Sequence, residues 1–157
     1  MKTSKIVKLV VSILLPLAIG GVAGIFTSNA IPGWFATLVR PSFAPPNWLF
    51  GPVWTTLYLV MGISLFLIWT IDAGKERNQA IFMFLLQLLF NFAWSFFFFY
   101  FKMIDVALID IVVLWISIIV MLRLFFKLKP WAAYINIPYL LWVSFATALN
   151  AAYYILN

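Results

Sequence analysis

The sequence contains no cysteine and no histidine, and only four acidic residues among 157. Without cysteine there are no disulfides, iron–sulfur clusters or thiolate nucleophiles, and without histidine the commonest metal ligand and general base are missing. The motifs of serine hydrolases, phosphate-binding loops and dinucleotide sites are missing too. We therefore expect no bound metal, no cofactor and no conventional acid–base or nucleophilic catalysis.

Charge is also scarce, at 9% of residues, whereas 66% are hydrophobic. A soluble domain is usually about 45–50% apolar and about a quarter charged, so this chain lacks the charge to cover a water-facing surface. The mean hydropathy of +1.11 agrees. The net charge of +6 comes from basic residues at the ends of apolar runs, which indicates membrane topology and not a nucleic-acid partner.

Five apolar runs are each long enough, as helices, to cross a hydrocarbon core about 30 Å thick. Their approximate ranges are 6–27, 48–71, 80–101, 106–126 and 131–156. Transmembrane strands would be about ten residues long and alternate in polarity, which these runs do not. The sequence predicts an all-α integral membrane bundle of five transmembrane helices, with residues 1–157 as one domain.

The first run also has features of a secretory signal. Three lysines, at positions 2, 5 and 8, precede its apolar part, and Ser28-Asn29-Ala30 loosely resembles a cleavage site. Its apolar part, 9–26, is longer than the usual signal core of about 7–15 residues. A retained transmembrane helix is therefore favoured over a cleaved signal.

Basic residues divide unequally between the two sides of a five-span protein. The side with the N-terminus and the second and fourth loops carries eight: Lys2, Lys5, Lys8, Lys75, Arg77, Arg123, Lys127 and Lys129. The other side carries two, Arg40 and Lys102. The positive-inside rule then predicts a cytoplasmic N-terminus and an external C-terminus, in a bacterial cell membrane.

The segment 28–47 is the one long connection between the runs. It contains four prolines and three aromatic residues, which are Trp34, Phe35 and Phe43. Long loops in compact proteins are often functional lids, and we expect a stiff aromatic lid at the external end. A connector that rests at headgroup depth is the alternative.

Placing a polar side chain inside a bilayer costs free energy, so each such residue indicates a structural or functional role. Gln87 and Asn91 are four residues apart on one helix face, which Trp94 and Ser95 continue. Hydrogen bonding between helices and contact with a ligand are equally compatible with this spacing.

In the fifth run, residues at steps of three and four form a stripe along one helix face. Such a stripe is compatible with the lining of a pocket for a flat apolar ligand and with ordinary helix packing in a bundle. Its members are Tyr139, Trp142, Ala146, Asn150 and Tyr153.

Three further features concern the packing of the spans. Asp110 is the one acid well inside a run, and pairing with Arg40 or Lys102 on the same side is favoured over a protonated or water-contacting carboxyl group. Pro138 lacks a backbone donor and is expected to kink the fifth helix. The GxxxG pattern in 20–24 allows close approach of helices, within the bundle or across a dimer.

Several segments resemble, in order, the motifs of the TspO/MBR family, the translocator and tryptophan-rich sensory proteins. They are 34–35, 40–48, 50–58, 87–94, 107–110, 138–142 and 145–150. The resemblance covers nearly the whole chain. It implies a five-helix membrane bundle, often a homodimer, with a ligand pocket inside the bundle beneath the long first loop.

The resemblance also implies ligands and binding residues. Family ligands include porphyrins such as protoporphyrin IX, cholesterol in animal members, and synthetic isoquinoline carboxamides and benzodiazepines. The implied ligand-binding residues are Trp34, Phe35, Pro45, Trp54, Gln87, Asn91, Trp142 and Ala146. Some bacterial relatives degrade protoporphyrin in light, with tryptophans at the positions of Trp54 and Trp142 implicated.

Two positions depart from the family pattern. Phe35 stands where many relatives have tyrosine, which removes a hydroxyl contact to the ligand. No basic residue follows Leu149 and Tyr153, so the cholesterol-recognition pattern of animal members is incomplete. Sterol binding is accordingly less expected than porphyrin binding.

The sequence thus predicts a membrane receptor for hydrophobic small molecules, with tetrapyrroles such as protoporphyrin IX as the expected class. Light-dependent degradation of the porphyrin is one alternative, since indole rings near a photosensitiser need no ordinary catalytic residue. Transport of porphyrin or lipid is another, although internal repeats and a buried ion-coupling network, which active transporters often have, are not evident.

Overall fold

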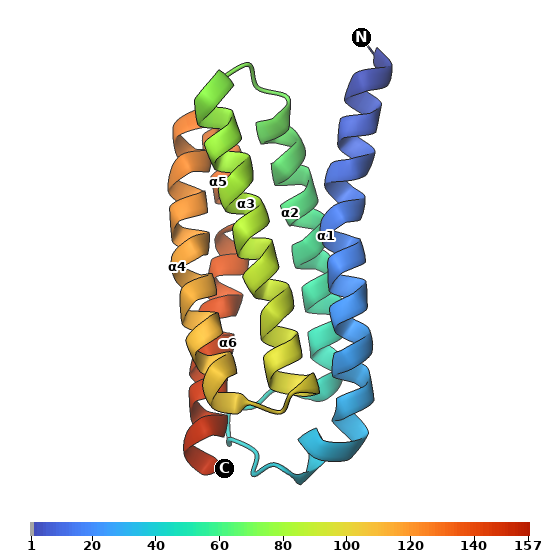
Figure 1. Ribbon diagram of the computed structural model, residues 1–157, viewed down its shortest axis with the longest axis vertical. Coiled ribbons are helices and arrows are strands. Elements are labelled where there is room, and N and C mark those ends of the chain that lie inside the picture. The colour runs from blue at the N-terminus through green and yellow to red at the C-terminus, as the bar shows by residue number, and fades with distance from the viewer. Residues whose placement is uncertain (1) are drawn as a thin grey trace.

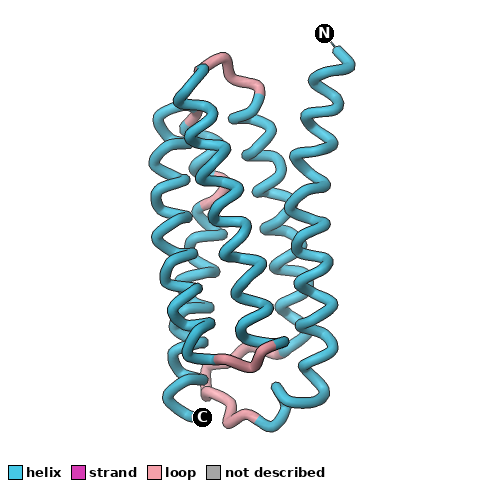
Figure 2. The backbone as a smooth tube through the Cα atoms, viewed as in Figure 1, coloured by secondary structure: helices cyan, strands magenta, loops and turns pink. Residues whose placement is uncertain are grey.

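The computed structural model describes residues 2–157. They form an elongated helical bundle with the N- and C-termini at opposite ends (Figure 1). Figure 2 shows that loops occupy only short stretches at the two ends and one break within the bundle. Five spans in the described chain are long and apolar enough to cross a membrane: Ser4–Phe35, Asn47–Trp69, Gly74–Tyr100, Ile104–Leu128 and Pro130–Leu156. The predicted all-α membrane bundle of five transmembrane helices is confirmed.

Each span consists of one long helix, in most cases extended by a short helical segment. In chain order the elements are α1 (Lys2–Ala30), η1 (Ile31–Phe35), η2 (Asn47–Leu49), α2 (Phe50–Trp69), α3 (Gly74–Ser95), η3 (Phe96–Tyr100), α4 (Ile104–Leu128), α5 (Pro130–Tyr134) and α6 (Ile137–Leu156). Helices dominate because a backbone surrounded by lipid must satisfy its own hydrogen bonds.

The first connection is shorter than the expected loop 28–47. Helix α1 continues to Ala30 and the π-helical turn η1 follows it, so the irregular part is confined to about 38–46. Pro32 is tolerated because it lies in the first turn of η1, where its missing donor is not needed. Gly33, inside η1, has non-helical backbone angles and marks a kink there.

The fifth span is broken, whereas one helix was expected over 131–156. Helix α5 ends at Tyr134 and α6 begins at Ile137. Pro138 lies in the first turn of α6, so the chain begins a new helix there and the expected kink becomes a break. Asn136 stabilises the break, since its Nδ2 donates to the Ala132 carbonyl at 2.8 Å.

One part of the core lies in the half of the bundle that holds the N-terminus, which we call the N-side half. Met61, Phe84 and Phe125 are fully buried there. Helices α1 and α2 are in close contact at Gly62. A Cβ atom added there would lie only 2.7 Å from the Ser12 carbonyl oxygen. The opposite half, the C-side half, contains the cavities described below.

The charged ends agree with the expected division of basic residues. The start of α1, the start of α3 and the end of α4 lie together at the N-side end, and the loops with Arg40 and Lys102 lie at the other (Figure 1). Which end faces the cytoplasm stays a prediction.

Candidate functional site

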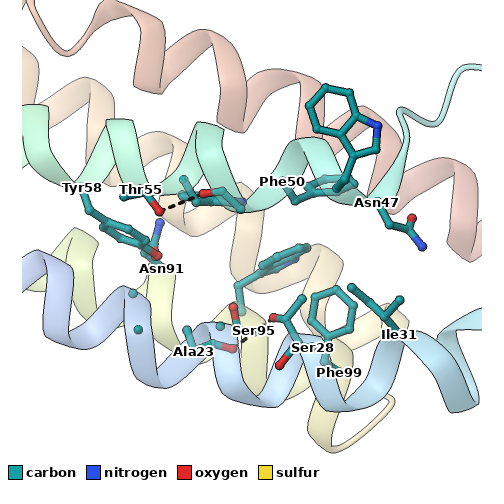
Figure 3. A pocket seen from close by; sticks show the side chains of 18 of the residues that line it. Ala23, Ser28, Ile31, Asn47, Phe50, Thr55, Tyr58, Asn91, Ser95 and Phe99 are labelled. Carbon is teal, nitrogen blue, oxygen red and sulfur yellow. Dashed lines mark hydrogen bonds between the residues drawn. The ribbon is translucent and has the colours of Figure 1, made fainter.

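A cavity of about 620 Å³ lies in the C-side half between α1, α2 and α3. Its walls come from 17–28 of α1, 50–58 of α2 and 91–95 of α3. Figure 3 shows α1 and α2 on opposite sides of this space, with Tyr58 and Asn91 at one end and Ile31 and Asn47 at the other. Three spans that are distant in sequence thus enclose one site.

Seven of the twenty residues that line the cavity are aromatic. Trp54 stacks on Tyr58, with ring centroids 5.5 Å apart and planes 27° apart. Trp48, Trp94 and Phe99 also line the cavity, whereas none of the lining residues is charged. Flat ring faces and few polar groups are typical of a site for an apolar small molecule and not for an ion.

Tyr58 closes the inner end of the cavity. Its ring occupies the space above Gly20, where a Cβ atom would come within 2.1 Å of a ring carbon. Its hydroxyl donates to Asn91 Oδ1 at 2.6 Å. Glycine at position 20 is therefore required for this ring position, and the hydrogen bond holds the ring there.

A chain of hydrogen bonds continues from this floor into the bundle. Asn91 Nδ2 donates to the Tyr139 hydroxyl at 3.0 Å, and that hydroxyl donates to Gln87 Oε1 at 2.7 Å. Gln87 Nε2 lies 4.0 Å from the Met61 sulfur. Hydrogen bonding between helices accounts for Gln87, whereas Asn91 makes such bonds and also faces the cavity.

A second cavity of about 30 Å³ lies on the α6 side of the first. Both cavities are lined by the same five aromatic residues: Phe35, Phe50, Trp54, Trp94 and Phe99. These rings form the wall between the two spaces. Trp94 is fixed in that wall because its Nε1 donates to Asn150 Oδ1 at 2.9 Å.

Four of the eight expected ligand-binding residues reach these cavities. Phe35, Trp54 and Asn91 line the large cavity, and Ala146 lines the small one. The structure therefore gathers at one place residues that come from η1, α2, α3 and α6. Their contact with a ligand stays a prediction.

The other four expected residues lie away from both cavity surfaces. The Trp142 ring packs against Phe50 at 5.9 Å between centroids, and the Trp34 ring packs against Phe98 at 5.8 Å. Gln87 bonds to Tyr139. The carbonyl of the fourth residue, Pro45, accepts a hydrogen bond from a guanidinium group of the loop. None of the four lines either cavity.

Several lining residues were not among those expected, notably Gly20, Gly21, Gly24, Thr55 and Tyr58. The GxxxG pattern was a visible signal for the glycines, but its interpretation covered only helix packing. Thr55 and Tyr58 lie within a family motif, and only the fold shows that they face α1.

The irregular loop lies over the end of α6 and does not line the large cavity. The Val39 amide donates to Asn157 Oδ1 at 2.7 Å, and Asn157 Nδ2 donates to the Val39 carbonyl at 3.2 Å. Phe43 packs edge-on against Phe145. Only the flanking η1 and η2 contribute to the cavity, and the lid role of the loop stays a prediction.

Asp110 does not make the expected ion pair. It is 7% exposed, and its Oδ2 has no hydrogen-bond partner within the described part of the chain. Arg40 donates instead to the carbonyls of Ala44 and Pro45, because its loop folds back on itself, and Lys102 is exposed. The predicted pairing with Arg40 or Lys102 is wrong.

Comparison with known proteins gives one consistent family. The model of the TspO/MBR family matches residues 12–156. The tryptophan-rich protein TspO of Archaeoglobus fulgidus is 42% identical over 153 residues, which cover 97% of this chain and 98% of that protein. The protein of the same name from Chlorobaculum tepidum is 38% identical over 149 residues, 93% of each chain. The translocator protein of Homo sapiens is 35% identical over 120 residues, 74% of this chain and 70% of that one. This chain, with its five membrane helices and aromatic cavity, therefore belongs to the TspO/MBR family.

Proposed function

We propose that this protein is a membrane receptor for hydrophobic small molecules, and that tetrapyrroles such as protoporphyrin IX are the class it binds. The observation that carries the proposal is the cavity of about 620 Å³ between α1, α2 and α3. Its volume falls within the range of about 300–1,000 Å³ that is typical of small-molecule sites. A relative in Cereibacter sphaeroides named tryptophan-rich sensory protein fits a receptor role.

The wall chemistry favours a broad, flat ligand. Trp54 and Trp94 offer ring faces for stacking, and buried apolar area contributes about 25 cal/mol per Å² before ordering costs. Asn91 and Ser95 supply polar contacts at the α3 wall. Because no lining residue is charged, the carboxylates of a porphyrin would have to point out of the cavity.

The test is a titration of the purified protein in detergent with protoporphyrin IX, followed by quenching of tryptophan fluorescence. We expect Trp54→Ala to weaken binding by about tenfold, the effect of losing about 1.4 kcal/mol of stacking and burial. Affinity is read from the midpoint, since removal of an indole changes the amplitude by itself. Trp131→Ala is the matched control, because Trp131 is 69% exposed and lines neither cavity.

Two results would decide against this site. One is unchanged affinity in a variant that combines Trp54→Ala with Trp94→Ala. The other is an equal loss of affinity in Trp131→Ala, which would mean that the porphyrin dissolves in the micelle near any indole.

Light-dependent degradation of the bound porphyrin is a second candidate activity. It is supported by the three indoles that line the large cavity, those of Trp48, Trp54 and Trp94. Trp142, the other tryptophan expected to take part, lies behind Phe50. Loss of porphyrin absorbance in light but not in darkness would favour this activity, and an equal loss with free tryptophan would count against it.

A further inference from the structure

The large cavity has its exposed side between α1 and α2. Among its lining residues, those from η1, α3 and η3 are all buried or half-buried. The exposed ones come only from α1, η2 and α2, and they are Gly21, Gly24, Ser28, Trp48, Gly51 and Thr55. The mouth of the cavity is therefore a gap between these two spans.

This mouth faces the hydrocarbon part of a membrane. The first span, Ser4–Phe35, has 32 residues, and a hydrocarbon core of about 30 Å covers about 20 of them. If the span is centred in the membrane, the covered part is about residues 10–29. Gly21 and Gly24 lie inside it, so the gap beside them opens toward lipid and not toward water.

The rim of the mouth is suited to contact with lipid. Its hydroxyl groups are already satisfied within their own helices: Thr55 donates to the Gly51 carbonyl at 2.9 Å, and Ser28 donates to the Ile25 carbonyl at 3.0 Å. Neither hydroxyl group therefore has to lose a hydrogen bond to water when an apolar molecule passes.

Three glycines border the gap. A Cβ atom at Gly21, Gly24 or Gly51 would meet nothing within 4 Å. None of the three is therefore needed for helix packing, in contrast to Gly20 and Gly62, whose missing Cβ atoms make room for a ring and for a helix backbone. The unfilled space beside these glycines, at the edge of the cavity, indicates a route by which a molecule enters or leaves.

We propose that the ligand enters and leaves the cavity sideways, from the hydrocarbon interior of the membrane through the gap between α1 and α2, and that Gly21, Gly24 and Gly51 set the size of molecule that passes. The proposal rests on the proposed function, since it names the route to that same site. On this route the ligand partitions into the bilayer before it enters the protein.

The test is stopped-flow quenching of tryptophan by protoporphyrin IX with the protein in lipid nanodiscs. In a Gly21→Leu, Gly24→Leu double variant we expect the association and dissociation rates to fall together by about tenfold or more, which corresponds to a barrier raised by about 1.4 kcal/mol. The dissociation constant should change much less than either rate. Gly24→Ala should slow both rates less than Gly24→Leu.

Two further variants separate a narrowed mouth from a damaged fold. Gly51→Leu narrows the gap from the α2 side and should slow both rates without touching α1. Ala18→Leu adds the same side chain at an exposed position of α1 that does not line the cavity, and its rates should equal those of the unaltered protein.

The outcomes are distinguishable. If the unaltered protein shows no saturable quenching, the proposed function itself fails. If it binds porphyrin and all mouth variants bind at unaltered rates, the sideways route is overturned and the proposed function stands. If only the dissociation rate rises in the mouth variants, the glycines contact the bound ligand and do not control its entry. If the oligomeric state changes while the rates do not, the glycines lie in an interface between copies of the protein. Either result overturns the route.

Discussion

The two halves of the bundle are built from the same five spans, yet one is solid and the other is hollow. In the N-side half, Gly62 brings the backbones of α1 and α2 together, and Met61 and Phe84 are fully buried beside them. In the C-side half, Gly21 and Gly24 have open space where a Cβ would be. The same residue type thus closes one half and leaves the other open.

The difference lies in what stands opposite each glycine. Flexible side chains such as Met61 adapt to the space that neighbouring helices leave, and close packing results. In the C-side half, rigid rings pack on other rings, Trp54 on Tyr58 and Trp94 on Phe98, and leave the gap unfilled. We infer that stability resides mainly in the N-side half and ligand capacity in the C-side half.

The largest effect that tests this division is expected from Phe84→Ala. The Phe84 ring is fully buried and lies parallel to Phe125, with an angle of 9° between the planes. Its removal should lower the free energy of unfolding by about 3 kcal/mol through lost contacts and a new cavity. Phe99→Ala is the paired variant, because Phe99 already borders two cavities, and it should cost about half as much.

Both variants can be compared by reversible unfolding in mixed micelles of mild detergent and SDS. Equal losses of stability in Phe84→Ala and Phe99→Ala would remove the distinction between a solid half and a hollow half.

A smaller effect is expected when a methyl group is added at the closest contact of the solid half. In Gly62→Ala the new Cβ would lie 2.7 Å from the Ser12 carbonyl oxygen and 2.8 Å from Ile13 Cα, which are backbone atoms. Helices α1 and α2 would have to separate, at a cost of about 2 kcal/mol. Gly51→Ala is the control, since its Cβ meets nothing within 4 Å, and thermal unfolding should show little change. A stable Gly62→Ala protein would contradict the tight contact.

The smallest effect concerns the hydrogen-bond chain at the boundary of the two halves. Tyr139→Phe keeps the ring but leaves Gln87 Oε1 and Asn91 Nδ2 without their partner. The free energy of unfolding should fall by about 1 kcal/mol, and porphyrin affinity should change little because Tyr139 lines neither cavity. Tyr58→Phe, in contrast, should change affinity as well, since Tyr58 forms the cavity floor. The same titration and unfolding assays measure both.

The fold was predictable because lipid leaves the backbone few choices. A run such as 106–126, apolar and nearly uninterrupted, must be a helix in a membrane, and the structure extends it only by a turn or less at each end as α4. The breaks were less predictable. The break at Asn136 precedes Pro138 by two residues, since a proline in a first turn moves the irregular backbone ahead of itself.

The site was only partly predictable, because side-chain direction depends on partners in other spans. Spacing placed Gln87 and Asn91 on one face, but whether each meets a ligand depends on Tyr139, which reaches between them from α6. The expected partner of Asp110 failed for a similar reason, since Arg40 bonds within its own loop. Glycines carry no side-chain signal at all, so the mouth beside Gly24 could be found only from the assembled helices.

The pair of hydrogen bonds between Val39 and Asn157 has a consequence for biosynthesis. These residues are 118 positions apart in the chain. A ribosome that adds roughly 5–20 residues per second needs about 6–24 s to make the intervening part. During that interval the loop after α1 has emerged, but its partner at the end of α6 does not yet exist. The end of the bundle that holds the C-terminus is therefore completed last, after every span has been synthesised, and a nascent chain with four spans in the membrane still lacks the anchor for its first loop.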